Sequence, residues 1–209
     1  AGFCGGSFLH SVIDRFIRGS YIAYLKPCSF NLSRNFPLVE TLFALAFVIS
    51  YLKFGISLDF IFISLFLVLL ISASVIDWYL KIIPNKLNLI GIISGLVYAG
   101  VKSLAMGKLE PLVNSIVGGL VGGGVLLIVA IAYLVIRKVE GIGMGDVKLL
   151  AFIGSYIGWA GALFTIFSGF VIAFFISRLL LKSHLKKPVY IAFAPILAAA
   201  SIVYLLFFS

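Results

Sequence analysis

Residues 58–76 read LDFIFISLFLVLLISASVI, an apolar run in which Asp59 is the one charged side chain. A helix needs about 20 mostly apolar residues to cross the hydrocarbon core of a bilayer. Hydrophobic residues make up 63% of the whole chain and charged residues 11%, against roughly half and a quarter in ordinary globular proteins. So few charges cannot cover a water-soluble protein of this size. The sequence therefore predicts a single integral membrane domain over residues 1–209.

Similar apolar runs recur along the chain, separated by clusters of Gly, Pro and charged residues. They predict an all-α, polytopic helical bundle of about eight transmembrane segments, at Ala1–Ile17, Pro37–Leu52, Leu58–Ile76, Leu87–Leu104, Leu112–Ile136, Val147–Ile157, Ala160–Leu181 and Val189–Phe208. Five glycines lie within the fifth segment, and such small residues favour close packing of membrane helices: Gly118, Gly119, Gly122, Gly123 and Gly124.

The cations predict the orientation of these segments. Thirteen of the sixteen lysines and arginines lie in the odd-numbered loops, and the even-numbered loops hold Lys53, Lys102 and Lys108. Cytoplasmic loops carry an excess of Lys and Arg, so the odd loops are predicted to be cytoplasmic. The cations that give the net charge of +9 lie between apolar runs, and no basic stretch combines with aromatic residues as binding of single strands requires. The expected partner is therefore membrane lipid and not nucleic acid.

Two acidic residues stand at the edges of apolar runs. Asp77 ends the run at 58–76, and Asp146, within GIGMGDVK at 141–148, leads into another run. Carboxylates at the edge of the hydrocarbon layer are costly and usually face a polar cavity or a partner. Both lie at predicted cytoplasmic helix ends, so the two side chains are expected at similar depth.

This pair suits acid–base hydrolysis. Two close carboxylates do not ionise together readily, so they share one proton. One can then deprotonate a water while the other protonates a scissile carbonyl. Gly143 and Gly145 would let an extended peptide approach the backbone closely.

Each aspartate also has a purely structural interpretation. Asp77 could pair with Lys81, four residues on, and Asp146 could cap a helix that begins near Val147. Lys148 lies on a different helix face from Asp146, so it is expected to orient substrate or phospholipid and not to pair with Asp146.

Glu40 lies one turn inside the helix expected from Pro37, where a helix N-terminus would stabilise a carboxylate. The sequence leaves open whether Glu40 serves this helix start or belongs to a site.

Four motifs in order resemble those of bacterial type IV prepilin peptidases. GIGMGDVKLL at 141–150 closely resembles their GxGD segment, and DWYLKIIPNKLN at 77–88 resembles their first catalytic segment. GFCGGSFLHSVIDR at 2–15 and SRNFPLVE at 33–40 are similar to their N-terminal motifs. The resemblance implies a membrane hydrolase of the GxGD aspartyl protease class, in the bacterial inner membrane, with its active site facing the cytoplasm.

The resemblance also implies the roles of individual residues. Asp77 and Asp146 match the catalytic pair that cuts short basic leaders from prepilins and pseudopilins, the subunits of type IV pili and of protein secretion systems. This cleavage needs no cofactor. Many members are also methyltransferases, which methylate the new N-terminus with S-adenosylmethionine, and Arg34 and Glu40 match family positions on the cytoplasmic side.

The chain departs from the family in its first cytoplasmic loop. Many members carry two CxxC pairs there, which are thought to hold zinc, whereas residues 18–36 contain only Cys28. No metal site is therefore predicted, and methyl transfer is left open.

Other functions fit part of the pattern. A GxGD peptidase for another substrate, such as a preflagellin, would use the same two aspartates. A proton-coupled transporter could use them as relay groups, but the sequence shows no internal repeat of the kind that such transporters often have. A scaffold protein would not need paired acids at equal depth.

Overall fold

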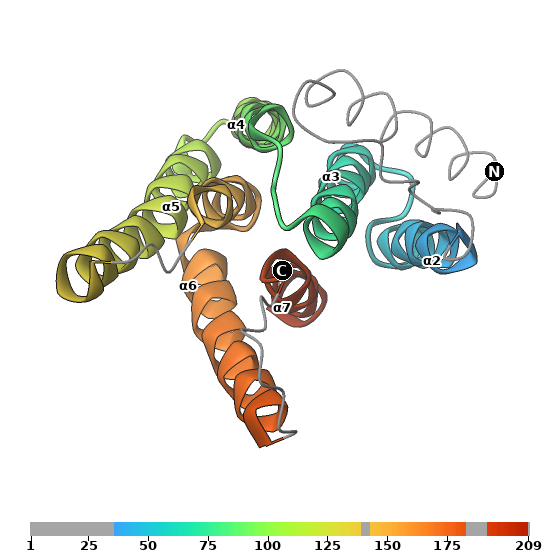
Figure 1. The fold of residues 1–209 in the computed structure, drawn as a ribbon. Coiled ribbons are helices and arrows are strands. Elements are labelled where there is room, and N and C mark those ends of the chain that lie inside the picture. The colour runs from blue at the N-terminus through green and yellow to red at the C-terminus, as the bar shows by residue number, and fades with distance from the viewer. Residues whose placement is uncertain (1–35, 139–142, 183–191, 209) are drawn as a thin grey trace. The chain divides into compact units, whose positions relative to one another are not determined.

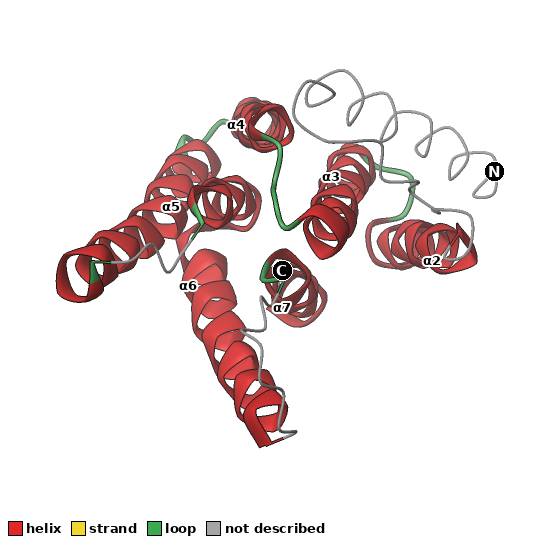
Figure 2. Cartoon of the chain, in the orientation of Figure 1, coloured by secondary structure: helices red, strands yellow, loops and turns green. Residues whose placement is uncertain are grey.

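The computed structural model describes residues 36–138, 143–182 and 192–208. Within these residues the chain forms six helices and no strand (Figures 1 and 2). The helices are α2 (Phe36–Phe54), α3 (Leu58–Leu80), α4 (Asn85–Met106), α5 (Glu110–Arg137), α6 (Met144–Lys182) and α7 (Ala194–Phe208). The predicted all-α class is therefore confirmed.

Helices α3, α4, α5 and α6 are long and apolar enough to cross a membrane, judged by length and composition. Two further apolar helices, Phe43–Phe54 within α2 and Ala194–Phe208, are shorter. The count of about eight segments is not confirmed, because the described residues form six helices. The predicted segment Ala1–Ile17 lies outside the described residues, and Val147–Ile157 and Ala160–Leu181 both fall within α6.

Helix α6 is nevertheless interrupted between those two segments. Gly158 has φ 74° and ψ −178°, a conformation that lies outside the helical region and that residues with a Cβ rarely adopt. After this break, the Trp159 N–H donates to Asn114 Oδ1 of α5 at 3.4 Å. The two halves of α6 can therefore take different directions and pack against different helices.

The described residues fall into two compact units, with the boundary after Ser72, inside α3. In the first unit, the Ser57 hydroxyl donates to the Phe54 carbonyl at 2.9 Å and accepts the Phe60 N–H at 3.3 Å. Ser57 thus caps the start of α3, as serine commonly does. Gly55, with φ 60°, directly follows Phe54, the last residue of α2.

In the second unit, glycines of α5 face the first half of α6. A Cβ on Gly118 would overlap the backbone at Gly154, and one on Gly122 would overlap the Leu150 carbonyl oxygen. The expected close packing is confirmed at these positions, whereas Gly124 has nothing within 4 Å. The first half of α6, which begins beside Asp146, is therefore held tightly against α5.

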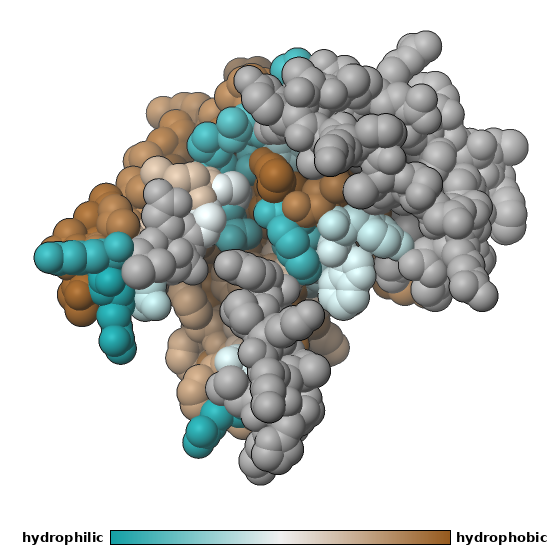
Figure 3. Space-filling view, in the orientation of Figure 1, coloured by the Kyte–Doolittle hydropathy of each residue, from teal (hydrophilic) through white to brown (hydrophobic). Residues whose placement is uncertain are grey.

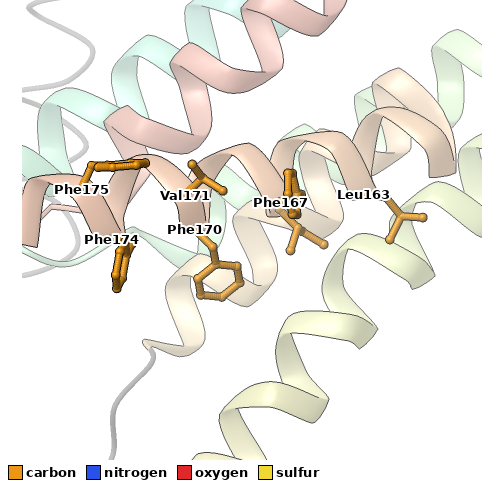
Figure 4. A pocket seen from close by; sticks show the side chains of 7 residues that line it. Leu163, Phe167, Phe170, Val171, Phe174 and Phe175 are labelled. Atoms are coloured by element: carbon orange, nitrogen blue, oxygen red, sulfur yellow. The ribbon is translucent and has the colours of Figure 1, made fainter.

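The second half of α6 packs beside α7. The Phe164 and Tyr204 rings have centroids 5.5 Å apart, and those of Phe170 and Phe193 lie 5.8 Å apart. Along the same half of α6 runs an apolar groove, drawn in Figure 4, lined by Leu163, Ile166, Phe167, Phe170, Val171, Phe174 and Phe175. Such a lining suits a hydrocarbon environment.

Large apolar side chains are exposed along the last three turns of α5, up to the cations Arg137 and Lys138. In Figure 3, apolar residues cover α5 and hydrophilic residues gather near its C-terminal end. This distribution is typical of a helix surrounded by lipid that ends at a membrane interface.

Candidate active site

Asp77 lies in the last turn of α3 and is 6% exposed. Its Oδ2 accepts a hydrogen bond of 3.1 Å from the N–H of Ala194, the first residue of α7. The Lys81 ammonium, which could have paired with Asp77, lies over the Trp78 ring, 5.5 Å from its centroid. The backbone at the start of α7 thus donates to this carboxyl group, and the Lys81 charge acts on Asp77 as well.

Asp146 lies in the first turn of α6. The expectation that this helix begins near Val147 is wrong, because α6 begins at Met144 and takes Asp146 into the helix. The Asp146 N–H donates to the Gly143 carbonyl at 3.1 Å. A Cβ on Gly143 would lie 3.3 Å from Asp146 Oδ2, so the carboxyl group folds back toward this glycine.

Gly145 has a different neighbour, the segment that joins α3 to α4. A Cβ on Gly145 would lie 3.2 Å from Ile83 Cβ, closer than most real contacts of this kind. The Asn88 side chain of α4 donates from Nδ2 to the Gly145 carbonyl at 3.1 Å. The absence of a side chain at position 145 therefore lets the start of α6 pack against the segment that joins α3 to α4. This packing involves residues that precede Val147, the expected start of the helix.

The end of α3 and the start of α6 bring the two predicted catalytic aspartates together. Asp77 and Asp146 lie close enough for their charges to interact. Both belong to the second compact unit, together with the start of α7 that hydrogen-bonds Asp77. This arrangement brings two carboxyl groups and a backbone donor together at the ends of these helices, as acid–base chemistry on a bound peptide requires.

The remaining predicted site residues are less closely tied to this pair. The exposed Lys148 donates from Nζ to Asn85 Oδ1 at 2.8 Å, and its role toward substrate or phospholipid stays a prediction. Glu40 lies in α2, but its side chain is outside the described part of the structure, as is Arg34 together with most of the loop 18–36.

Metal binding finds no support in the part of the chain that the structure describes. Within residues 36–138, 143–182 and 192–208, no three His, Cys, Asp or Glu side chains form a group that could hold a metal ion.

Sequence reasoning missed two groups at the site, the Ala194 N–H and the Asn88 side chain. Pro195 directly follows Ala194 and is a recognisable signal for the start of a helix, but the partner of a backbone N–H leaves no trace in sequence. Asn88 is the last residue of the motif at 77–88, but its residue type and position predicted no role for it.

Known proteins resemble this chain along most of its length. Residues 63–178 match the type IV leader peptidase family. The chain is 32% identical over 182 residues to a prepilin leader peptidase/N-methyltransferase of Aeromonas salmonicida, a match that covers 86% of this chain and 60% of the relative. It is 33% identical to the Bacillus subtilis protein of the same name, with 85% and 68% covered. No solved structure matches the chain.

A third relative, a type 4 prepilin-like proteins leader peptide-processing enzyme of Escherichia coli, is 34% identical over 136 residues, which cover 64% of this chain and 48% of the relative. The chain thus spans about 60% of the length of the Aeromonas relative. The family match includes both Asp77 and Asp146. This chain belongs to the type IV leader peptidase family.

Proposed function

We propose that this chain is an aspartyl endopeptidase of the bacterial cytoplasmic membrane that removes the short basic leader from type IV prepilins and pseudopilins. The observation that carries this proposal is that the segment following Asp77 packs against Gly145, directly before Asp146, through Ile83 and Asn88. Family membership supports the substrate class. The surplus of cations in the odd-numbered loops supports an active site that faces the cytoplasm.

The reaction needs one proton shared between the two carboxyl groups. The ionised carboxylate takes a proton from a water as the water oxygen bonds to the scissile carbonyl carbon, and the protonated carboxyl group gives its proton to the carbonyl oxygen. The tetrahedral intermediate then collapses. The C–N bond breaks as the now protonated carboxyl group gives its proton to the leaving nitrogen, and the other, ionised carboxylate takes the proton of one hydroxyl group. The products are a carboxylic acid and an amine, and the pair again shares one proton. Because the pair acts as a unit, separate acid and base roles are not assigned.

Backbone groups around the aspartates would orient this pair. The Ala194 N–H fixes one oxygen of Asp77, and Gly143 leaves room for the folded-back carboxyl group of Asp146. An extended peptide could approach the exposed Gly143 without meeting a side chain.

Peptide cleavage by two carboxyl groups and a water requires no cofactor, and we propose that the leader is removed without one. Methyl transfer from S-adenosylmethionine would involve Arg34 and Glu40, whose side chains the structure does not describe.

The test is cleavage of a type IV prepilin in liposomes by the parent protein and by the Asp77→Asn and Asp146→Asn variants. Each substitution keeps the size of the side chain but removes its ability to exchange a proton. Since acid–base groups typically contribute about 10²–10⁴-fold, each variant should lose at least about a hundredfold in kcat.

Asp59→Asn supplies the matched control, because Asp59 lies in the first turn of α3, at the opposite end of the helix that carries Asp77. This variant should cleave at the parent rate. An Asp77 or Asp146 variant that is as fast as the Asp59 variant would exclude the two-aspartate mechanism. Cleavage of a preflagellin but not of a prepilin would retain the mechanism and change the substrate.

A further inference from the structure

Asn88 makes a contact that its place in the chain does not require. It is the fourth residue of α4 and is 1% exposed, and its carboxamide donates from Nδ2 to the carbonyl of Gly145 at 3.1 Å. The partner fixes the orientation of the carboxamide, since a carbonyl oxygen only accepts and the nitrogen must face it. A buried side chain of α4 is thereby hydrogen-bonded to the residue directly before Asp146.

This bond is not needed to satisfy the backbone of α6. In an α-helix, the carbonyl of residue 145 already accepts the N–H of residue 149. Burial of a polar carboxamide costs free energy, and Asn88 Oδ1 finds no donor among the described residues. A leucine of similar size would avoid both costs, so stability alone does not explain an asparagine at this position.

The contact does explain how the two aspartates are held in register. Asp77 and Asn88 stand at the two ends of one short segment, which runs from the last turn of α3 into α4. The same segment contacts Gly145 twice, through Ile83 at its centre and through Asn88. The backbone at Asp146 is therefore attached directly to the piece of chain that carries Asp77.

We propose that Asn88 is a positioning residue, which fixes the start of α6 against the α3–α4 segment and so sets the distance between the two catalytic carboxyl groups. This inference rests on the proposed function, since it gives Asn88 a role only if Asp77 and Asp146 act together. Catalytic groups must be held within about 0.5 Å of their productive geometry, and an error of about 1 Å can cost a hundredfold in rate.

The test is the Asn88→Leu variant in prepilin cleavage in liposomes, with kcat and KM measured separately. Leucine fills similar space, removes the donor to Gly145 and removes the acceptor that has no described donor. The thermal unfolding midpoint should equal or exceed that of the parent. We expect kcat to fall about 10- to 100-fold with KM unchanged, because Asn88 acts through Asp146 and not on the substrate.

Ser103→Ala is the matched control on the same helix. Ser103 is buried near the other end of α4, and its Oγ accepts the N–H of Leu112 at 3.2 Å, so it also links α4 to a distant backbone. Its loss should lower the unfolding midpoint and leave kcat within about twofold of the parent, since this contact lies at the helix end remote from the aspartates. The two variants should thus show opposite patterns.

Each outcome decides the inference. If the parent cuts, Asp146→Asn is inactive and Asn88→Leu keeps the parent kcat, Asn88 has no positioning role, while the proposed function stands. If the parent does not cut, the proposed function itself fails. Should Asn88→Leu not fold, Asn88→Ser replaces it, because a serine hydroxyl is too short to reach the Gly145 carbonyl. The serine variant should show the same loss of kcat, and a full rate would overturn the inference.

Discussion

Replacing Ala194 by proline would remove the backbone donor to Asp77 and place the ring Cδ where the N–H hydrogen pointed, so the carboxyl group would also have to move. Ala194 is the first residue of α7, where an N–H has no intrahelical acceptor and where the fixed φ of proline suits the helix. Its N–H donates to Asp77 Oδ2 at 3.1 Å. The substitution therefore tests whether the contact between the start of α7 and Asp77 orients this carboxyl group.

The magnitude follows from the character of this bond. Asp77 is 6% exposed and Ala194 is fully buried, so water cannot replace the lost donor. A hydrogen bond to a charged group contributes about 1.5–3 kcal/mol, and each loss of about 1.4 kcal/mol from the transition state slows a reaction tenfold. If the bond is fully expressed in the transition state, kcat should fall about 10- to 150-fold, with KM nearly unchanged.

The assay is prepilin cleavage in liposomes, together with thermal unfolding in detergent. Ala194→Gly is the control, because glycine also changes the buried side chain at this position but keeps the N–H. The glycine variant should retain most of the parent kcat. If the folded proline variant is as fast as the glycine variant, the bond between α7 and Asp77 does not orient the catalytic group, and the reasoning is wrong.

Two further predictions concern the glycines that hold α6. Gly118→Ala would press a methyl group against the backbone of α6, and such overpacking typically costs about 1–3 kcal/mol. The thermal unfolding midpoint of this variant should therefore be lower than that of Gly124→Ala, which adds a methyl group on the open face of the same helix. Equal midpoints would contradict the close packing of α5 against α6. Gly158→Ala would put a side chain on a residue with φ 74°, at a cost of about 1–3 kcal/mol, so this variant should unfold at a lower temperature than the parent. Gly100→Ala is the control and should not destabilise the protein, because a Cβ at Gly100 would have nothing within 4 Å. A Gly158 variant that unfolds at the parent temperature would show that the break in α6 tolerates other residues.

The helices could be predicted from sequence because the membrane makes the signal local. Each apolar run must satisfy its backbone internally and therefore forms a helix. The boundaries were less accurate where contacts with distant residues decide them. A helix was expected to begin near Val147, whereas α6 begins at Met144, where Gly145 packs against Ile83 of another segment.

The site could be predicted only as far as its charged side chains. Asp77 and Asp146 were identified because a carboxyl group at the edge of an apolar run needs a reason. Their supports could not be identified in the same way. The bonds from Ala194 to Asp77 and from Asn88 to Gly145 join residues 117 and 57 positions apart, and each uses a backbone group that nearly all residue types share.

These supports share a physical origin in the ends of the helices. An apolar helix leaves its first four N–H groups and its last four carbonyls without intrahelical partners, and in a membrane protein such groups must be satisfied by protein or face a polar cavity. In the second unit, the end of α3 and the starts of α4, α6 and α7 all contribute to the site. Donors and carboxyl groups are therefore gathered at one place without polar residues in the middle of the spans. For this reason the proposed chemistry needs only short motifs at helix ends. The rest of each helix has only to be apolar, with glycine at the points where α5 approaches α6 most closely.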